Sequence, residues 1–198
     1  MIKRPKLFLV GGPNGAGKST FAHTFLAEHP DYVFLNADEI ARQLQPENVH
    51  EARFGAGRTF LTELAALRAA QANLVVESTL SGVSLAQHIR LFAAAGYYIS
   101  LVFVFVPSVQ LSINRVASRV LAGGHHIPTE DLVRRFKRSK RNFWRTYRLL
   151  ADEWQLILNA DAGFVYVADF ANHGLTVQAE SVFADFVEEQ GPDLVRTA

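Results

Sequence analysis

Gly12-Pro-Asn-Gly-Ala-Gly-Lys-Ser19 is the stretch on which the predicted fold depends, because it fits the pattern G-x-x-x-x-G-K-S/T. The apolar run Leu7 to Val10 precedes it, and an apolar pattern with helical spacing that includes Phe21 and Phe25 follows it. A strand, a glycine loop and a helix in this order form a phosphate-binding loop. A chance match in a chain of this length has a probability of roughly one in a hundred, so a plain glycine turn is the weaker alternative.

The residues of this loop are predicted to bind ATP together with Mg²⁺. Lys18 is expected to reach the β and γ phosphates, and Ser19 is expected to ligate Mg²⁺. Switches, motors and transporters share such loops, so the loop alone does not predict catalysis. The other predicted nucleotide-binding positions of the loop are Gly12, Pro13, Asn14, Gly15, Ala16, Gly17 and Thr20.

Short apolar runs alternate with longer amphipathic stretches on both sides of the loop, which is typical of an α/β fold with a mostly parallel sheet. We predict a P-loop domain like that of nucleotide kinases, with five parallel strands, helices on both faces and a helical lid. The strands are expected at Leu7 to Val10, Tyr32 to Asn36, Leu74 to Val76, Tyr98 to Val106 and Phe164 to Ala168. Helices are expected to begin near Lys18, Glu39, Ala52, Leu85, Val109 and Thr129, with a last helix from Val177 to Glu189.

The composition excludes several classes of protein. Apolar residues make up 49% of the chain, which is enough for the core of a single domain over residues 1–198. The absence of cysteine excludes disulfides, Cys-type zinc sites and thiolate nucleophiles. A formal net charge of +1 argues against nucleic acid or an anionic membrane as a general partner. The run Leu7 to Val10 is too short for a signal peptide or a membrane span, so the expected location is the cytoplasm.

Two acidic residues follow predicted strands, and ligands of open parallel sheets bind beyond the carboxyl ends of the strands. Asp38 is expected to accept a proton from a substrate hydroxyl, and its alternative role is a helix N-cap. Glu77 is expected to hold Mg²⁺ through water or to contact substrate. Thr79 and Ser81 add hydroxyl groups nearby, although a polar loop explains them almost as well.

The segment 111–150 contains ten Lys or Arg residues and only two acids. Arg115 and Arg119 lie one turn apart on one predicted helix, and Arg134, Arg135 and Arg138 lie on the next. Such a helical hairpin suits a lid that excludes water and neutralises phosphate charge. The alternatives are a solvated helix face and, less favoured, a nucleic-acid surface with salt-dependent affinity.

Three further features receive structural interpretations. His125 and His126 are expected to contact solvent or backbone rather than to act as metal ligands or bases. Trp144 and Tyr147 are expected in the core rather than as a platform for a nucleobase. The segment Asn159 to Gly163 precedes the last predicted strand, where related folds have the loop that contacts adenine.

Taken together, four stretches resemble the zeta toxin family over roughly residues 6 to 168, and most closely its compact stand-alone branch. They are Gly11 to Thr20, Asn36-Ala-Asp38, Glu77 to Gly82, and Gly123 to Pro128 with Arg134 to Phe143. The resemblance implies a nucleotide-kinase-like fold and phosphorylation of UDP-N-acetylglucosamine by ATP. It also implies toxicity and an antitoxin protein as partner. By motif, it gives catalytic or phosphate-binding roles to Lys18, Asp38, Arg115, Arg119, Arg135 and Arg138.

The function expected from these residues is ATP-dependent transfer of a phosphate to a hydroxyl group of a small molecule. UDP-N-acetylglucosamine or a related sugar nucleotide is the first acceptor to consider. A nucleoside or nucleotide acceptor is equally compatible with a loop, a base and a lid. The alternative from another class is a nucleotide-dependent ATPase switch without a small-molecule acceptor.

Overall fold

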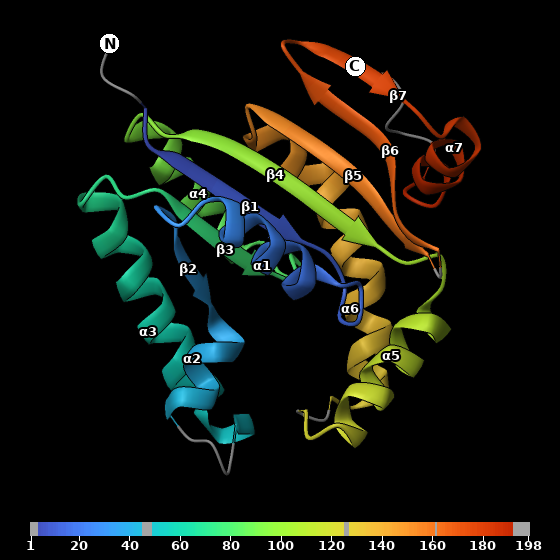
Figure 1. Ribbon diagram of the computed structural model, residues 1–198, viewed down its shortest axis with the longest axis horizontal. Helices are drawn as coiled ribbons and strands as arrows, with labels where there is room; N and C mark the ends of the chain where they lie inside the picture. The colour runs from blue at the N-terminus through green and yellow to red at the C-terminus, as the bar shows by residue number, and fades with distance from the viewer. Residues whose placement is uncertain (1–3, 45–48, 125–126, 161, 192–198) are drawn as a thin grey trace.

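The computed structural model describes residues 4–44, 49–124, 127–160 and 162–191. Within these residues the chain forms a seven-stranded sheet with helices on both faces (Figure 1). The strands are β1 (Lys6–Gly11), β2 (Val33–Asn36), β3 (Leu74–Ser78), β4 (Tyr98–Phe105), β5 (Glu153–Ala160), β6 (Gly163–Ala171) and β7 (Gly174–Val177). The helices are α1 (Lys18–Glu28), α2 (Ala37–Leu44), α3 (Val49–Ala69), α4 (Ser84–Ala94), α5 (Val109–Leu121), α6 (Thr129–Asn142) and α7 (Glu180–Glu188). None of these helices is both long enough and apolar enough to cross a membrane.

The strand order across the described sheet is β2-β3-β1-β4-β5-β6-β7. The first five of these strands pair in parallel, whereas β6 and β7 are antiparallel additions at one edge. The α/β class is therefore as predicted, but the strand count is wrong. The fifth parallel strand is β5, while the predicted fifth strand, Phe164 to Ala168, lies inside antiparallel β6. Val177, the predicted start of the last helix, ends β7.

The missed strand β5 lacks the continuous apolar run that marks a fully covered parallel strand. Trp154 and Leu156 are buried, but Gln155 between them is exposed. Strand β5 is followed directly in the sheet by its antiparallel partner β6, to which it is joined by a short connection. The exposed Gln155 thus interrupts the apolar pattern near the start of β5, although Ile157 on the same face is buried.

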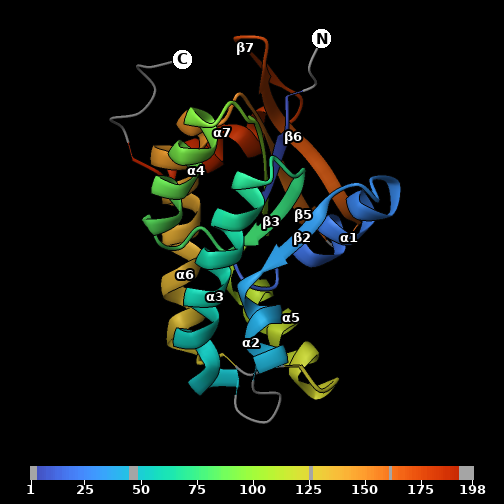
Figure 2. The same ribbon diagram turned by 90° about the vertical axis from the view of Figure 1, so that its left-hand side faces the viewer.

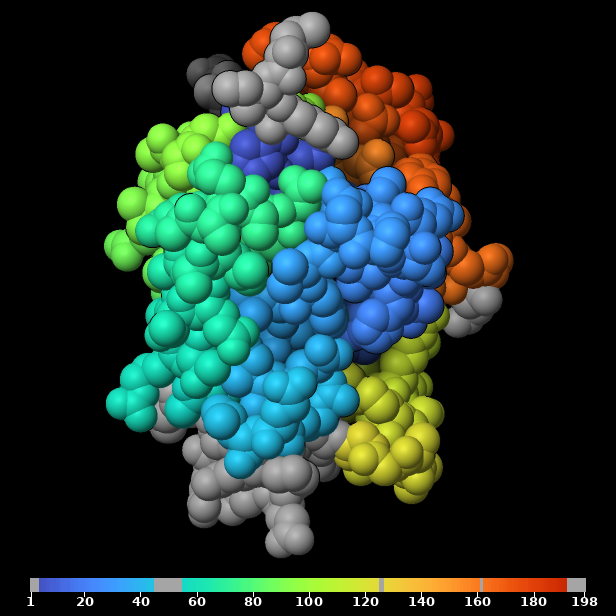
Figure 3. Space-filling view, turned by 60° about the vertical axis from the view of Figure 1, so that its left-hand side comes forward, coloured from blue at the N-terminus to red at the C-terminus, as the bar shows by residue number. Residues whose placement is uncertain are grey.

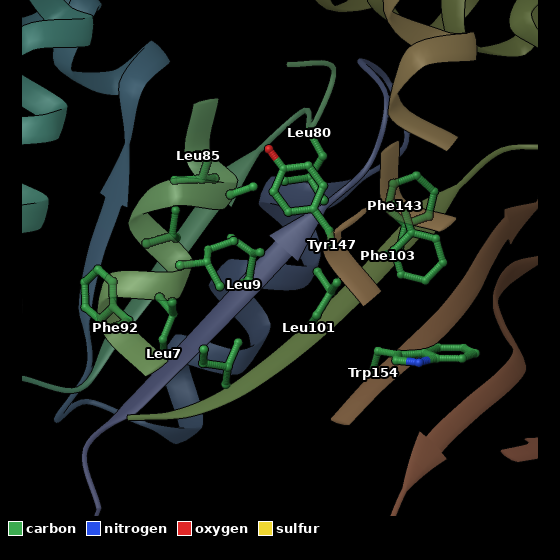
Figure 4. Packing of buried hydrophobic residues seen from close by; sticks show 14 of the residues in the cluster. Leu7, Leu9, Leu80, Leu85, Phe92, Leu101, Phe103, Phe143, Tyr147 and Trp154 are labelled. Carbon is green, nitrogen blue, oxygen red and sulfur yellow. The ribbon is translucent and has the colours of Figure 1, made fainter. Parts of the chain in front are cut away.

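Alternate residues of β1 point to opposite faces of the sheet. Leu7 and Leu9 belong to the larger buried cluster together with Leu85 and Phe92 of α4 (Figure 4). The cluster also includes side chains of α3 and α7. Val10 instead packs with Ala22 of α1. Figure 2 shows the same division, with α3, α4, α6 and α7 on one side of the sheet and α1 on the other. The strand is thus buried on both faces, which fixes the loop that follows it.

Helix α6 ends at Asn142. It passes into a π-helical turn, Phe143–Tyr147, and then a short 3₁₀ turn, Arg148–Leu150. Trp144 and Tyr147 are 5% and 1% exposed, which agrees with their predicted place in the core. Phe143 stacks on Phe103 of β4 with ring centroids 4.4 Å apart (Figure 4).

The carboxyl-terminal helix α7 packs against this π-helical turn. Phe186 of α7 is 1% exposed and contacts the rings of Phe143 and Trp144. Lys140 of α6, only 4% exposed, pairs with Glu189 just after α7. The Lys140 ammonium lies 5.1 to 5.4 Å from the ring centroids of three phenylalanines, Phe105, Phe136 and Phe186. An ammonium held by a carboxylate and aromatic faces fixes this half of α6 to the domain.

Two helical pairs extend past the carboxyl ends of the parallel strands. Figure 1 shows α2 with α3 on one side of the phosphate loop and α5 with α6 on the other. Ser112 in the first turn of α5 donates a hydrogen bond to the carbonyl oxygen of Asn14, so α5 starts in contact with the loop. The sheet thereby brings the loop and both helical pairs to one end of the molecule.

Candidate functional site

The loop between β1 and α1 needs glycine at three of its positions. Gly12, Gly15 and Gly17 have φ values of 145°, 73° and 92°. A Cβ atom on Gly12 would lie 2.0 Å from the carbonyl oxygen of Val104, so a side chain there would disrupt the sheet. No side chain caps the amino end of α1 at Gly17. Backbone N–H groups at the amino end of α1 can therefore donate hydrogen bonds to an anion, which is what a phosphate cradle requires.

Lys18 folds back over this loop and is 7% exposed. Its Nζ donates a hydrogen bond to the carbonyl oxygen of Pro13 at 3.0 Å. The same atom lies 3.9 Å from Oε1 of Glu77 at the end of β3. The ammonium group thus lies between the phosphate loop and a strand-end carboxylate.

Burial lowers the pKa of Lys18 below its ordinary value. The charges of Glu77 and Asp38 act against this shift, and those of Arg119 and Arg135 add to it. A charge shifts a pKa appreciably only when it lies nearby, so these four charged groups lie close to the Lys18 ammonium. The structure therefore gathers around one ammonium two acids and two arginines that the sequence analysis singled out.

Glu77 is 8% exposed and uses both carboxylate oxygens. Its Oε1 accepts from the hydroxyl of Ser19 at 3.0 Å, and its Oε2 accepts from Nδ2 of Asn36 at 2.9 Å. A hydroxyl and a carboxylate side by side are the oxygen donors that Mg²⁺ prefers. Among the described residues no group of three or more His, Cys, Asp or Glu side chains could hold a metal. The donor atoms of Ser19 and Glu77 are thus of the kind that fits Mg²⁺.

Asp38 lies in the first turn of α2, but the helix cap is another residue. Oδ1 of Asn36 accepts from the backbone N–H of Asp38 at 2.8 Å, so Asn36 caps the helix and the capping alternative for Asp38 is wrong. The Asp38 carboxylate is exposed and makes no hydrogen bond or ion pair with any described residue. It is therefore available to a ligand.

Two cavities meet at these residues. The first, of about 470 Å³, lies between the phosphate loop, α2, α5 and the residues that follow α5. Figure 3 views the side on which α1, α2 and α5 approach one another. The second, of about 440 Å³, lies between α2, α3, the start of α4 and α6. Four residues line both cavities: Lys18, Asn36, Asp38 and Glu77. The two cavities therefore share one group of polar and charged side chains.

The predicted lid arginines are divided between the two cavities. Arg115 and Arg119 line the first cavity, and Arg115 also donates to the carbonyl oxygens at the end of β5, which lie 3.3 and 3.4 Å away. Arg135 lines the second cavity and lies 3.7 Å from Asp131 on its own helix. Arg138 is exposed and lines neither cavity. Arg134, the fifth predicted lid arginine, is also exposed and also lines neither cavity, so the structure brings three of the five to the site.

The other sequence expectations have mixed outcomes. Thr79 lines the second cavity, and its hydroxyl lies 2.9 Å from that of Ser81. His125 and His126 lie outside the described residues. In the segment expected to contact adenine, Asn159 belongs to β5 and its Nδ2 donates to the carbonyl oxygen of Ala16 at 2.9 Å. Gly163 begins β6, and Asp161 lies outside the described residues.

Two residues of the site were missed as functional candidates. Asn36 both caps α2 and holds Glu77, and its place at the end of a predicted strand was a usable signal. Arg58 of α3 lines the second cavity. No local pattern distinguishes Arg58 from other helix-surface arginines, because its position depends on how α3 packs against α2.

Comparison with known proteins gives a consistent result. The family model described as "Zeta toxin" matches residues 1–166. A curated protein of Haemophilus influenzae (strain ATCC 51907 / DSM 11121 / KW20 / Rd), itself described as uncharacterized, is 30% identical over 133 residues. These residues make up 67% of this chain and 93% of that protein.

Solved structures share the fold at lower identity. AvrRxo1-ORF1 in complex with AvrRxo1-ORF2 and ATP has a TM-score of 0.74 and 20% identity, and the match covers 98% of this chain and 66% of that chain. The present chain thus spans slightly less than two thirds of that protein. A structure of the PezAT chromosomal toxin-antitoxin system of Streptococcus pneumoniae has a TM-score of 0.67 and 20% identity, covering 98% and 88% of the two chains. Such likenesses confirm the predicted P-loop kinase fold.

Proposed function

The chain belongs to the zeta toxin family, and from that premise we propose that it is an ATP-dependent kinase that phosphorylates a hydroxyl group of a small molecule. The observation that carries the proposal is the pair of cavities that share Lys18, Asp38 and Glu77. A kinase needs a donor and an acceptor on opposite sides of the transferred phosphate. An ATPase switch needs only the first of these cavities.

On the donor side, backbone N–H groups of the phosphate loop bind the phosphates of ATP, and Lys18 moves from the Pro13 carbonyl to phosphate oxygens. Ser19 and Glu77 hold Mg²⁺, directly or through water. Mg²⁺ held by these two residues would supply positive charge that neutralises part of the phosphate charge. The complex of AvrRxo1-ORF1 with ATP, a protein of the same fold, supports this choice of nucleotide.

On the acceptor side, Asp38 accepts the proton of the attacking hydroxyl and orients that hydroxyl toward the γ phosphate. Arg119 and Arg135, one from each cavity, stabilise the negative charge of the transferred group. Helix α5 and the first half of α6, within segment 111–150, act as a lid that excludes water when both substrates are bound.

The proposed acceptor is UDP-N-acetylglucosamine or a related sugar nucleotide. The second cavity supports this choice because Arg58 and Arg135 suit a diphosphate, while Phe60 and Leu61 offer an apolar surface to a ring. A nucleoside or nucleotide acceptor remains the alternative. The complexes of AvrRxo1-ORF1 with AvrRxo1-ORF2 and of the PezAT system support an antitoxin as protein partner. We further propose that the kinase acts in the cytoplasm, where ATP is available.

The proposal is tested by incubating the protein with γ-labelled ATP, Mg²⁺ and either UDP-N-acetylglucosamine or a bacterial metabolite extract. We expect label to appear in an organic phosphate, identified by mass spectrometry. Label only in inorganic phosphate, with hydrolysis stimulated by a protein partner, would favour the ATPase switch. Label in another metabolite would keep the kinase and replace the acceptor.

Glu77→Gln is expected to raise the Mg²⁺ concentration needed for half-maximal activity by about ten- to a hundredfold. The amide keeps the shape of the side chain but loses the negative charge that faces Ser19 and Lys18. The measurement is a Mg²⁺ titration of phosphoryl transfer. Glu153→Gln is the control, since Glu153 lies at the amino end of β5, at the opposite end of the sheet. An unchanged Mg²⁺ requirement in Glu77→Gln would remove Glu77 from the metal site.

A further inference from the structure

The loop of residues 78–82, which we call the acceptor loop, has an unusual backbone. It begins at Ser78, the last residue of β3, and contains Leu80, a non-glycine residue with a φ of 53°. The Leu80 side chain is 1% exposed and packs so closely on β1 that a Cβ atom on Gly11 would lie 2.4 Å from it. A leucine in the left-handed region is strained, and such strain persists only where the surrounding structure holds it.

Three side chains from one helical segment hold this loop through its backbone carbonyl oxygens. Ser139 donates to the carbonyl of Thr79, and Asn142 donates to that of Leu80 at 2.9 Å. The hydroxyl of Tyr147 donates to the carbonyl of Gly82 at 2.6 Å. Leu80 and Tyr147 also belong to the same buried cluster (Figure 4).

The donors are built into the fold rather than attached to a moving part. Ser139 is fully buried and Tyr147 is 1% exposed. Between them, Lys140 is fixed by Glu189 and by three aromatic rings. The π-helical turn offsets the register of the segment, and turns of this type occur often at functional sites. Burial raises the pKa of Tyr147 to about 12, so its hydroxyl stays protonated and donates across the physiological pH range.

The acceptor loop forms part of the second cavity. Ser78 and Thr79 line that cavity together with Asp38, and Arg135 lines it from α6, one turn before Ser139. The wall of the cavity and one of its arginines are therefore attached to the same helix. A shift of that wall would change where an acceptor hydroxyl lies relative to the base.

We propose that Ser139, Asn142 and Tyr147 are positioning residues that hold the acceptor loop in its strained conformation, so that the second cavity keeps an acceptor aligned with Asp38. The part of this inference that concerns an acceptor and its alignment with Asp38 rests on the proposed kinase function. Holding of the loop itself does not depend on that function. These residues touch neither of the reacting groups, and they act through the carbonyl oxygens of the loop.

The test uses Tyr147→Phe and Asn142→Ala, with Tyr97→Phe as matched control. Tyr97 is likewise fully buried and its hydroxyl donates to two backbone carbonyls, of Leu67 and Ala72, away from the acceptor loop. Thermal unfolding first shows how much stability each variant loses. Hydrogen exchange of the amides in residues 79–85 then measures the holding of the loop, and steady-state kinetics measures its consequence.

We expect exchange in residues 79–85 to become about tenfold faster in Tyr147→Phe and Asn142→Ala, but not in Tyr97→Phe. We also expect kcat/KM for the labelled acceptor to fall by about tenfold, while binding of a non-hydrolysable ATP analogue with Mg²⁺ changes by less than about twofold. If the side chains had a merely structural role, exchange and kcat/KM would change in all three variants, Tyr97→Phe included, in proportion to the stability that each variant loses.

The outcomes separate this inference from the proposed function. Unchanged exchange in Tyr147→Phe and Asn142→Ala would overturn the inference whether or not the protein is a kinase. Faster exchange with unchanged acceptor kinetics would overturn the positioning role. If the wild-type protein labels no metabolite, the kinase proposal fails and the acceptor alignment fails with it, while exchange still decides whether these side chains hold the loop.

Discussion

Lys18→Met is expected to reduce phosphoryl transfer by at least about a thousandfold. The ammonium group lies between the phosphate loop and Glu77, where it faces both the donor and the acceptor cavity. Methionine has a similar length but supplies no charge to phosphate oxygens during transfer. The loss is therefore expected in kcat as well as in ATP binding.

The same substitution is not expected to lower the free energy of unfolding. Burial lowers the pKa of Lys18 relative to the unfolded chain, so the protonated form opposes folding at every pH below the unfolded pKa. This cost is present at neutral pH and diminishes as pH rises through the folded pKa. Removing the charge removes the cost, while Ser19 and Asn36 still bind Glu77.

Transfer of label from ATP and urea unfolding measure these two effects. Lys137→Met is the control, because Lys137 is an exposed lysine of α6 that lines neither cavity. Retention of more than about a tenth of wild-type transfer in Lys18→Met would contradict the role assigned to the loop lysine. A large loss of stability would show instead that Lys18 holds the loop together.

Asp38→Asn is expected to lower kcat by about a hundred- to ten-thousandfold. The amide keeps the size of the side chain but cannot accept a proton from the attacking hydroxyl. Nucleotide binding is expected to remain, because phosphate contacts come from the loop and from Lys18. Removing a negative charge near Lys18 is even expected to favour the binding of an anion.

The measurement is single-turnover transfer at saturating ATP and acceptor, together with the affinity for an ATP analogue. Asp31→Asn is the control, since Asp31 precedes β2 at its amino end, whereas Asp38 follows the carboxyl end of the same strand. Wild-type kcat in Asp38→Asn would exclude this carboxylate as the base. Loss of nucleotide binding alone would make it part of the donor site.

The phosphate loop and the strand ends were predictable because their chemistry is local in sequence. Glycines at left-handed positions, a lysine and an adjacent hydroxyl must occur in fixed order, and Gly12 to Ser19 satisfy that order. Asp38 and Glu77 follow strands whose apolar runs are visible in the sequence. Parallel pairing then brings both carboxylates to the same edge of the sheet.

The cap of α2 could not be assigned in advance. Asn36 and Asp38 are both good capping residues, and they are two positions apart. The choice depends on where β2 ends, which the pairing of Asn36 with Glu77 determines. Tertiary contacts decide at which of two nearby residues a helix begins. The sequence alone therefore left Asp38 with two possible roles.

The sequence also did not predict how α6 contacts the acceptor loop. Helical spacing identified a basic face that includes Arg134 and Arg138, but it did not indicate the π-helical turn at Phe143–Tyr147. That turn depends on burial of aromatic side chains against β4 and α7. Long-range packing, rather than local propensity, determines which side chains of the segment reach residues 78–82.

The position of α7 bears on where the chain can be cut. The family match ends at residue 166, in the middle of β6, whereas Phe186 and Glu189 lie beyond it. A fragment cut at the family boundary would expose the rings of Phe143 and Trp144 and leave the ammonium of Lys140 without its carboxylate. Fragments made for expression or for transplantation into another scaffold must therefore extend at least to Glu189.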